Sequence, residues 1–152
     1  MKNIEIIVLA NAGIAKATGY ELSSDEAYQL YQLKKQVEKA VTEIRSAESE
    51  LVGAAGIENP KTFDARTKEL MEKSERTEEE KEELAEHTAR LDKLNELRRA
   101  LYNDETEIKV KPIPFESWFK LQKENAKDNI FNGEVESILE DVFWTAPQDN
   151  SK

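Results

Sequence analysis

Cysteine is absent from this 152-residue chain, which also has only 5 glycines, 4 prolines and 1 histidine. The lack of cysteine excludes disulfide bonds, thiolate metal sites and thiol catalysis. A single histidine leaves no second imidazole for a histidine-based metal site. Basic residues are outnumbered, and the net charge of −10 argues against direct binding of nucleic acid through clustered lysine and arginine. We therefore expect no cofactor and no direct nucleic-acid partner.

Long hydrophobic runs are missing as well. No uninterrupted apolar stretch approaches the roughly 18 residues of a membrane span. Residues 4–9 are mostly apolar, but Glu5 interrupts them and no small-residue cleavage site of a secretory signal follows. The sequence predicts a cytoplasmic protein with no membrane partner.

The most regular feature that is present is a heptad pattern between Ser23 and Leu51. Its apolar members alternate steps of three and four residues, with lysines and glutamates between them: Leu30, Leu33, Val37, Ala40, Ile44, Ala47 and Leu51. This spacing is typical of a long helix that packs along one seam against a partner helix. We interpret residues 24–54 as that helix, and a second helical region follows over residues 62–101.

The two helices are predicted to form a long, antiparallel, coiled-coil-like hairpin that turns near Asn59–Pro60. In this register Lys34, Lys35 and Lys39 face glutamates between residues 78 and 83. Thr77 and Glu80 have the spacing of a capping box, so a kink or break of the second helix near residues 74–80 is a further expectation.

The remaining segments complete a mainly α fold. Residues 4–18 favour a short helix ending near Gly19, and a strand at 4–9 is the alternative, because Ile4–Leu9 is rich in β-branched residues. Residues 104–144 predict a small C-terminal α/β cap, with an extended edge segment followed by short helices. We thus expect one helical domain over residues 1–144 and a disordered tail at 145–152.

The residues that could carry chemistry are few. His87 lies between Leu84 and Leu91 and is interpreted as a partly buried seam residue. The acidic run from Glu78 to Glu86 is interpreted as a solvated helix face, because successive helical positions point in different directions. Asp104, Glu105 and Glu107 lack the companion residues of a nuclease site. The sequence therefore predicts a protein that is not an enzyme.

Aromatic residues in the last third offer a different role. They lie in a region with few long elements to bury them, and the interpretation in which they complete the core stands beside one in which some anchor another chain. The candidate partner-docking residues are Trp118, Phe119, Phe143 and Trp144.

The chain resembles a family of small helical proteins encoded by tailed phages and prophages, in two blocks that cover most of its length. The first comprises the apolar leader, Tyr20–Glu21–Leu22 and Ala27–Tyr28–Gln29–Leu30. The second comprises Leu94–Asn95–Glu96–Leu97, Glu105–Thr106–Glu107–Ile108, Ile113–Pro114–Phe115 and Leu139–Glu140–Asp141–Val142–Phe143. The resemblance implies a phage or prophage origin and a non-enzymatic role.

Two functions follow as hypotheses. The first is a structural or protein-interaction protein of phage type, acting in phage assembly or in the host. The alternative is an acidic inhibitor that mimics nucleic acid and blocks a host enzyme, which the net charge and the Glu78–Glu86 run motivate. Ala27, Tyr31 and Val41 widen the apolar margin of the long helix, so we also expect a homodimer.

Overall fold

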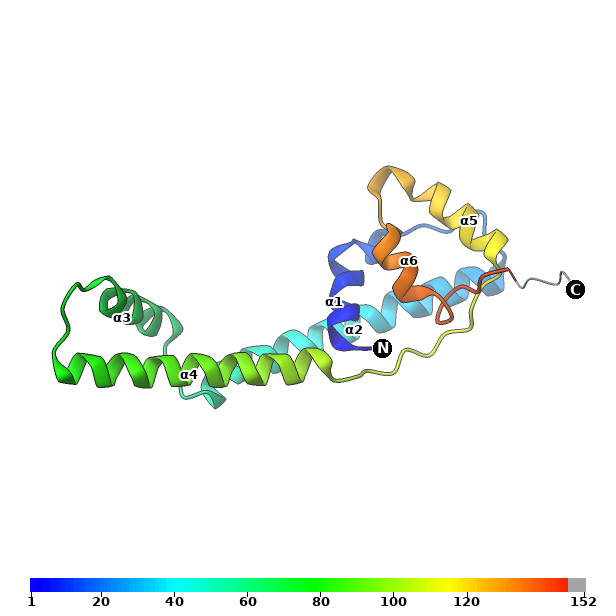
Figure 1. Cartoon of the computed structure of the whole chain (residues 1–152). Helices are drawn as coiled ribbons and strands as arrows, with labels where there is room; N and C mark the ends of the chain where they lie inside the picture. Colours follow the sequence, from blue (N-terminus) through cyan, green and yellow to red (C-terminus); the bar gives the residue numbers. More distant parts are fainter. Residues whose placement is uncertain (148–152) are drawn as a thin grey trace, which may run out of the picture. The chain divides into compact units, whose positions relative to one another are not determined.

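The computed structural model describes residues 1–147, and within them the chain is mainly helical (Figure 1). Six α-helices are present in this part of the chain, with 3-10 turns at Ile14–Lys16 and Ala126–Asp128. The helices are α1 (Asn3–Asn11), α2 (Ser24–Ala54), α3 (Pro60–Glu72), α4 (Glu78–Asn103), α5 (Phe115–Glu124) and α6 (Gly133–Leu139).

Helix α2 begins and ends where its local sequence dictates. The Ser23 hydroxyl accepts from the Glu26 backbone N–H at 3.3 Å, and the Glu26 carboxylate accepts from the Ser23 N–H at 3.1 Å. This reciprocal pair satisfies two backbone donors that a helix start leaves open. Beyond the other end, Gly56 takes a left-handed conformation with φ of 84°, which an L side chain rarely adopts. The predicted bounds of 24–54 are confirmed.

The heptad positions of α2 face the protein interior. The buried members of the pattern are Leu30, Leu33, Val37, Ala40 and Ile44, each less than 5% exposed. Val41, one position outside the seam, is also buried at 6% exposed, because a helix that is covered on two sides buries a wider stripe than a two-stranded coiled coil does.

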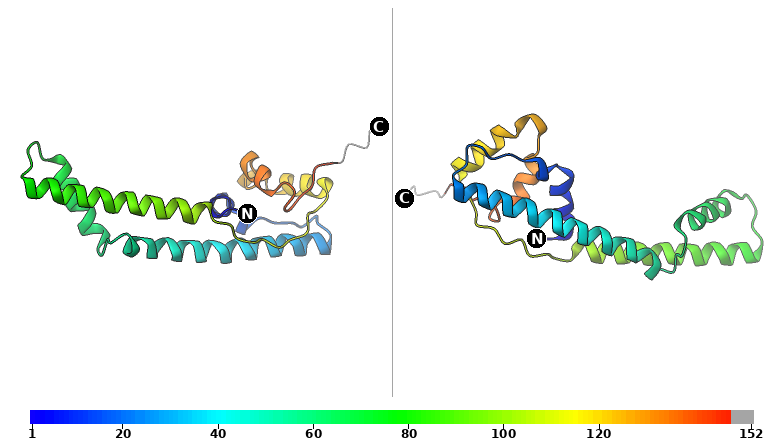
Figure 2. Two further views of the ribbon diagram at one scale, coloured as in Figure 1. Left: turned by 60° about the horizontal axis from the view of Figure 1, so that its bottom comes forward. Right: turned by 180° about the vertical axis from the view of Figure 1, so that it is seen from behind.

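The second helical region is broken between Glu72 and Glu78, as the Thr77 signal predicts. The Thr77 hydroxyl accepts from the Glu80 N–H at 3.1 Å, and the Glu80 carboxylate accepts from the Thr77 N–H at 3.1 Å. The break folds α3 back alongside α4, which both views of Figure 2 show. Arg66 donates two hydrogen bonds to Glu83, each 2.8 Å long, and Lys73 pairs with Glu80.

These ion pairs correct the predicted register of the hairpin. Glu78, Glu82 and Glu83 were expected to face lysines of α2, but Glu83 pairs with Arg66 of α3 and Glu78 pairs with Lys81 of α4. Lys34 instead donates to the Ala17 carbonyl at 2.8 Å. The end of α2 does contact the end of α4, where the Tyr102 hydroxyl donates to Glu48 at 2.7 Å. A hairpin over the full predicted length stays unconfirmed.

The N-terminal segment is a helix rather than a strand, but it is shorter than predicted. Helix α1 ends at Asn11, and Gly13, with φ of 92°, provides the left-handed turn that we expected at Gly19. Gly19 is required for close packing and not for a left-handed turn. A Cβ atom there would lie 2.8 Å from the Leu22 side chain and 2.9 Å from that of Leu30, so glycine permits close packing of the loop on α2.

The C-terminal part of the chain is a helical cap, and the predicted α/β character is not confirmed. In residues 1–147 only isolated bridges occur, such as Ile113 with Trp144. The extended segment finds side chains instead of a partner strand: Gln36 and Gln29 of α2 accept from the Lys109 and Lys111 N–H groups. Of the predicted disordered tail, Thr145 donates to the Ile113 carbonyl at 3.3 Å, and residues 148–152 lie outside the described part.

Two compact units can be distinguished. The first comprises Met1–Glu43 and Glu105–Lys152, and the second comprises Ile44–Asp104. In the first unit, α1, α5 and α6 lie around the N-terminal part of α2, and their core includes Ile6, Leu9, Leu121, Val135 and Leu139, each at most 1% exposed (Figure 1). The second unit has a smaller core of Ala55, Ile57, Phe63 and Leu94. The single domain expected over residues 1–144 stays a prediction.

Candidate functional site

Three of the four aromatic residues proposed as docking anchors are buried. Trp118 and Phe143 are 0% exposed and Trp144 is 6% exposed. The two indole rings stack, with 5.5 Å between their centroids and an interplanar angle of 5°. The Trp144 Nε1–H also donates to the Glu136 carbonyl at 2.9 Å, which fixes the ring in place. These three side chains form the core of the first unit, and only Phe119, at 50% exposed, is open to a partner.

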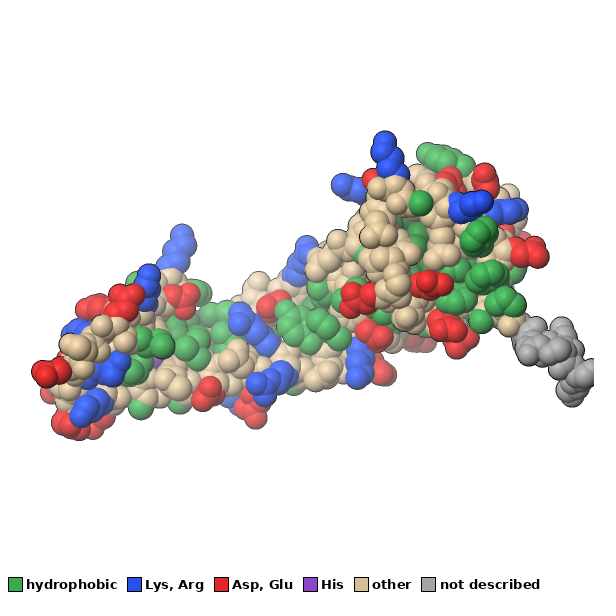
Figure 3. Space-filling model, turned by 45° about the horizontal axis from the view of Figure 1, so that its top comes forward, with side chains coloured by type: hydrophobic (Ala, Val, Ile, Leu, Met, Phe, Trp, Pro, Cys, Tyr) green, Lys and Arg blue, Asp and Glu red, His purple; other side chains and the backbone are tan. Residues whose placement is uncertain are grey.

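Other aromatic side chains are exposed in their place. Apart from Met71, the large hydrophobic side chains that the structure exposes all belong to the first unit, and five of them are aromatic: Tyr20, Tyr28, Tyr31, Phe115 and Phe119. Figure 3 shows hydrophobic side chains beside lysines on the surface of this unit. Scattered apolar residues are normal on a protein surface, but aromatic side chains are enriched at protein interfaces.

Four of the five exposed aromatics are arranged in two pairs, one on each of two helices, and Tyr20 lies in the loop before α2. On α2, the rings of Tyr28 and Tyr31 lie 6.5 Å apart, and the Lys35 ammonium lies 5.9 Å from the Tyr31 ring centroid. On α5, the rings of Phe115 and Phe119 lie 6.4 Å apart, with Lys123 5.2 Å from the Phe119 centroid. Both lysines are within the range of cation–π attraction.

One hydrogen bond joins α2 to α5, and the two aromatic pairs lie on the faces of these helices that are turned away from it. The Ser117 hydroxyl of α5 donates to the Glu26 carboxylate of α2. This bond is the main reason why the pKa of Glu26 lies below its ordinary value of 4.5. At the other end of α5, Glu124 accepts from the Tyr20 N–H at 2.9 Å. We call Tyr20, Tyr28, Tyr31, Phe115 and Phe119, with Lys35 and Lys123, the aromatic–lysine surface.

A hollow of about 500 Å³ adjoins this surface where α2 meets the extended segment. Its lining comprises Tyr28, Gln29, Gln32, Lys109, Val110 and Lys111. Two lysines are the only charged residues in that lining, although the chain as a whole carries a net charge of −10. The hollow is therefore a local positive site on an acidic protein.

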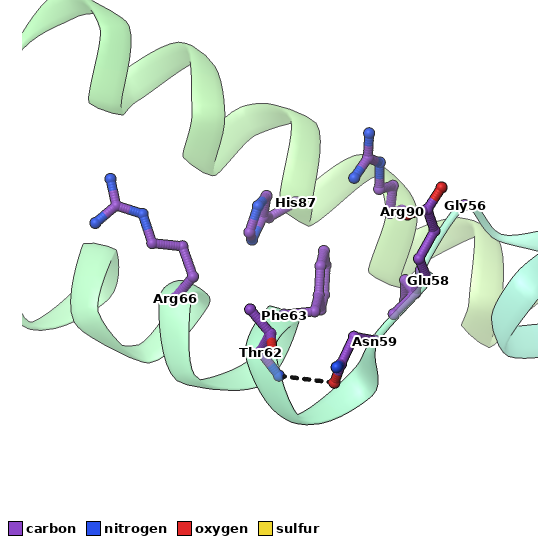
Figure 4. Close-up of a pocket in the computed structure, with 9 residues that line it drawn as sticks. Gly56, Glu58, Asn59, Thr62, Phe63, Arg66, His87 and Arg90 are labelled. Atoms are coloured by element: carbon purple, nitrogen blue, oxygen red, sulfur yellow. Dashed lines mark hydrogen bonds between the residues drawn. The ribbon is translucent and has the colours of Figure 1, made fainter.

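The single histidine lines another hollow, of about 450 Å³, in the second unit (Figure 4). His87 was interpreted as a partly buried seam residue; it is buried, at 8% exposed, but against α3. Its ring stacks on Phe63 with 4.3 Å between centroids, and its Nδ1 lies 2.7 Å from the Thr67 hydroxyl. These contacts are those of a packed side chain between α3 and α4.

The charges around His87 are already matched. Arg66 binds Glu83 through two bonds and Glu69 at 3.0 Å, and Arg90 pairs with Glu86. The bond from Arg66 lowers the pKa of Glu83, so the carboxylate stays charged opposite the guanidinium at neutral pH. The ion pairs leave fewer guanidinium donors of Arg66 and Arg90 open to an anionic ligand, and the contacts around His87 are those of packing.

The acidic run at the start of α4 is also largely paired. Glu78, Glu80, Glu83 and Glu86 form ion pairs with nearby lysines and arginines. The Lys73 contact, with help from the Thr77 backbone N–H, lowers the pKa of Glu80 to about 2. Within residues 1–147, no group of three or more histidine, aspartate or glutamate side chains is placed to hold a metal ion. Asp104, Glu105 and Glu107 therefore do not form such a group.

Comparisons with protein-family models, with curated proteins and with solved structures find no match to this chain. Among residues 1–147, none of the helices combines the length and the apolar character that crossing a membrane requires. The aromatic–lysine surface therefore stands on its geometry alone.

Of the exposed aromatic residues, only Phe119 was proposed from the sequence as a docking residue. On a helical wheel Tyr31 lies about 100° and Tyr28 about 160° from the seam residue Leu30, so both point away from the buried stripe. The exposed face of α2 could have been identified from Gln29, Gln32 and Gln36, whose polar side chains lie on the same face of the helix as Tyr28. The contact of these glutamines with residues 109–111 has no signal in the sequence.

Proposed function

We propose that this chain is a non-enzymatic protein-interaction protein of phage type that binds an acidic face of a partner protein through its aromatic–lysine surface. The observation that carries the proposal is the exposure of two aromatic pairs, each with a lysine over a ring. Aromatic side chains dominate the binding energy of protein interfaces, because they bury a large area at a small cost in conformational entropy. The helical hairpin serves as the scaffold.

Charge supports an acidic partner for this surface. Lys35, Lys109, Lys111 and Lys123 lie on or beside it, and positive groups on an otherwise acidic protein steer a complementary negative surface. The phage or prophage origin is part of the proposal and rests on the resemblance of the two sequence blocks. It makes a virion protein or a host protein the expected partner.

Mimicry of nucleic acid is the second candidate, and one observation weighs against it. A mimic needs unpaired carboxylates over one surface, but Glu80 and Glu83 are bound by Lys73 and Arg66. Glu79 and Glu82 remain on the exposed side of α4. The two candidates therefore place the contact with a partner in different units of the chain.

Site-specific photo-crosslinking tests the proposal. A photoreactive amino acid is placed at Tyr31, at Phe119, at Met71 or at Glu82 in separate full-length chains, and each is irradiated in a lysate of phage-infected bacteria. Met71 is the matched control, because it is 64% exposed and belongs to the second unit. We expect the same crosslinked protein from Tyr31 and Phe119 and not from Met71.

Competition shows whether the capture is specific. Excess unlabelled chain should abolish the crosslink, whereas a chain carrying Tyr28→Ser, Tyr31→Ser and Phe119→Ser should not. The yield should fall as salt is raised, because exposed charges are screened within about 10 Å at 0.1 M salt. Equal crosslinking from Met71 would overturn the proposal, and capture of a nuclease or polymerase from Glu82 alone would favour mimicry.

A second copy of the chain is another occupant that the same samples reveal. The homodimer was expected because Val41 and Tyr31 widen the apolar margin of α2, but Val41 is already buried within one chain. The dimer stays a prediction that rests on Tyr31 and Ala27. Sedimentation equilibrium should then report twice the 17.4 kDa chain mass, and the Tyr31 crosslink would join two copies.

A further inference from the structure

The extended segment beside α2 has its backbone groups bound on one side only. The Lys109 N–H donates to Gln36 Oε1 at 2.6 Å, and Gln36 Nε2 donates to the Lys109 carbonyl at 2.8 Å. Two residues on, the Lys111 N–H donates to Gln29 Oε1 at 2.7 Å. Because residues i and i+2 of an extended chain direct their backbone groups to the same side, the pattern marks residues 109–111 as extended against α2.

The other side of this segment is an open strand edge. In an extended chain the N–H and C=O groups of Val110 point away from those of Lys109 and Lys111. Within residues 1–147, no hydrogen bond reaches the backbone of Ile108 or Val110. Unpaired backbone groups in a row are a template for an added strand. On the side that faces α2, Gln29 and Gln36 thus form the hydrogen bonds that a neighbouring strand would otherwise form.

We propose that this edge binds an extended, acidic segment of the partner protein as an added strand along residues 108–111. The inference rests on the proposed function, because the hollow of about 500 Å³ next to the edge is lined by Tyr28 of the aromatic–lysine surface. Main-chain bonds to Val110 provide register, and acidic side chains of the added strand face Lys109 and Lys111.

Charge selects an acidic segment. The only charged residues that line the hollow are Lys109 and Lys111, and both are exposed. The nearest acid, Glu107, pairs with Lys109 at 3.7 Å, and both side chains are about three-quarters exposed, so this pair is weak and exchangeable. Opposite charges on directly facing strand positions stabilise a pair of strands.

The same residues disfavour a second copy of this chain as the occupant. Antiparallel pairing of two copies about Val110 places Lys109 of one copy opposite Lys111 of the other, and like charges in facing positions are destabilising. Pro112 also lacks the N–H that would extend the ladder. Lysine and proline at an edge are devices that prevent strands from pairing with themselves.

The free chain provides the first test. Amide hydrogen exchange followed by NMR should show slow exchange at Lys109 and Lys111, whose N–H groups are bound by glutamines, and fast exchange at Ile108 and Val110. The variant Gln36→Leu should speed exchange at Lys109 without changing Val110. Slow exchange at Val110 in the free chain would overturn the proposal, because the edge would already be occupied.

Defined peptides provide the second test. The probe is a short acetylated peptide of alternating valine and glutamate, and its controls carry lysine for glutamate or N-methyl groups on alternate amides. We expect the acidic peptide to slow exchange at Val110 and the two controls to leave it unchanged. Val110→Pro should abolish binding, Val110→Ala should retain it, and reversal of both lysines to glutamate should weaken it at least about tenfold.

The outcomes separate this inference from the proposed function. Val110→Pro is compatible with the extended conformation before it, and circular dichroism confirms that each variant is folded. Equal binding of the acidic peptide to wild type and Val110→Pro, or of the acidic and basic peptides to wild type, would overturn strand addition. A Tyr31 crosslink that persists in Val110→Pro would leave the proposed function standing without it.

Discussion

The Thr67 hydroxyl and the His87 ring form a buried hydrogen bond of 2.7 Å in which the roles of donor and acceptor are fixed by a third group. Thr67 Oγ1 also lies 2.8 Å from the Phe63 carbonyl, which can only accept. The hydroxyl has one hydrogen, which it donates to this carbonyl, so it must accept from His87 Nδ1–H. The geometry therefore places a proton on Nδ1 of His87.

Removal of the Thr67 hydroxyl should destabilise the second unit. Thr67→Val keeps the shape of the side chain but leaves the buried His87 Nδ1–H without a partner, which costs about 1–3 kcal/mol. Thr88→Val is the matched control, because its hydroxyl makes the same kind of bond to a carbonyl four residues earlier at an exposed site. Urea unfolding should show a clear loss for the first variant and less than about 0.5 kcal/mol for the second. Equal losses would contradict the assignment.

Much of the fold follows from local sequence. The heptad pattern and its flanking residues predicted the bounds of α2, and the Thr77–Glu80 spacing predicted the start of α4. Both signals depend only on residues that are close together in the sequence. The end of α1 was misplaced, because either Gly13 or Gly19 could have provided the left-handed turn. Only the packing of Leu22 and Leu30 on Gly19 distinguishes the two.

The candidate site could be predicted less well, since it depends on contacts between distant residues. Exposure of Phe119 and burial of Trp118 are decided by which face of α5 meets the rings of Phe131, Phe143 and Trp144. Likewise, Gln36 and Lys109 are 73 residues apart, and nothing local marks a glutamine that binds a distant backbone. The acidic run of α4 was expected to pair with lysines of α2, but its partners are Arg66 of α3, Lys73 after α3, and Lys81 and Arg90 of α4 itself.

Two glycines should respond in opposite ways to alanine. Gly19→Ala places a Cβ atom 2.8 Å from Leu22 and 2.9 Å from Leu30, and the resulting overpacking should cost about 1–3 kcal/mol. Gly53→Ala meets no atom within 4 Å and lies inside α2, so lower backbone entropy in the unfolded chain should stabilise it by up to about 1 kcal/mol. Thermal unfolding measures both. Stabilisation by Gly19→Ala would show that the loop does not pack as described.

The contact between α2 and α5 should weaken in acid. The Ser117 hydroxyl holds the pKa of Glu26 below 4.5, so this contact stabilises the fold above the unfolded pKa and loses its effect as the pH falls through the folded pKa. Ser117→Ala should cost about 0.5–1.5 kcal/mol at pH 7 and less below about pH 4. Ser137→Ala, on the exposed side of α6, is the control. A difference between wild type and Ser117→Ala that is constant from pH 7 to pH 3 would contradict this origin.

The hydrogen bond between Tyr102 and Glu48 should be lost at alkaline pH, when the phenol ionises. The bond from the Tyr102 hydroxyl to Glu48, at 2.7 Å, raises the pKa of the phenol above its ordinary value of 10.0, because ionisation would place two negative groups together. A raised folded-state pKa contributes stability that is complete below the unfolded pKa and is lost as the pH rises through the folded pKa. Arg98, 3.5 Å from Glu48, partly offsets this shift.

Tyr102→Phe should therefore be less stable than wild type at pH 7, by about 0.5–1.5 kcal/mol, and the difference should shrink above about pH 10. Tyr20→Phe is the control, because Tyr20 is 86% exposed. Glu48→Gln separates hydrogen bonding from charge, since the amide oxygen still accepts from the phenol but no longer repels its ionised form. Urea unfolding at pH 7 and at pH 10.5 should then show a smaller decline with pH for Glu48→Gln than for wild type, and an equal decline would rule out the carboxylate as the cause.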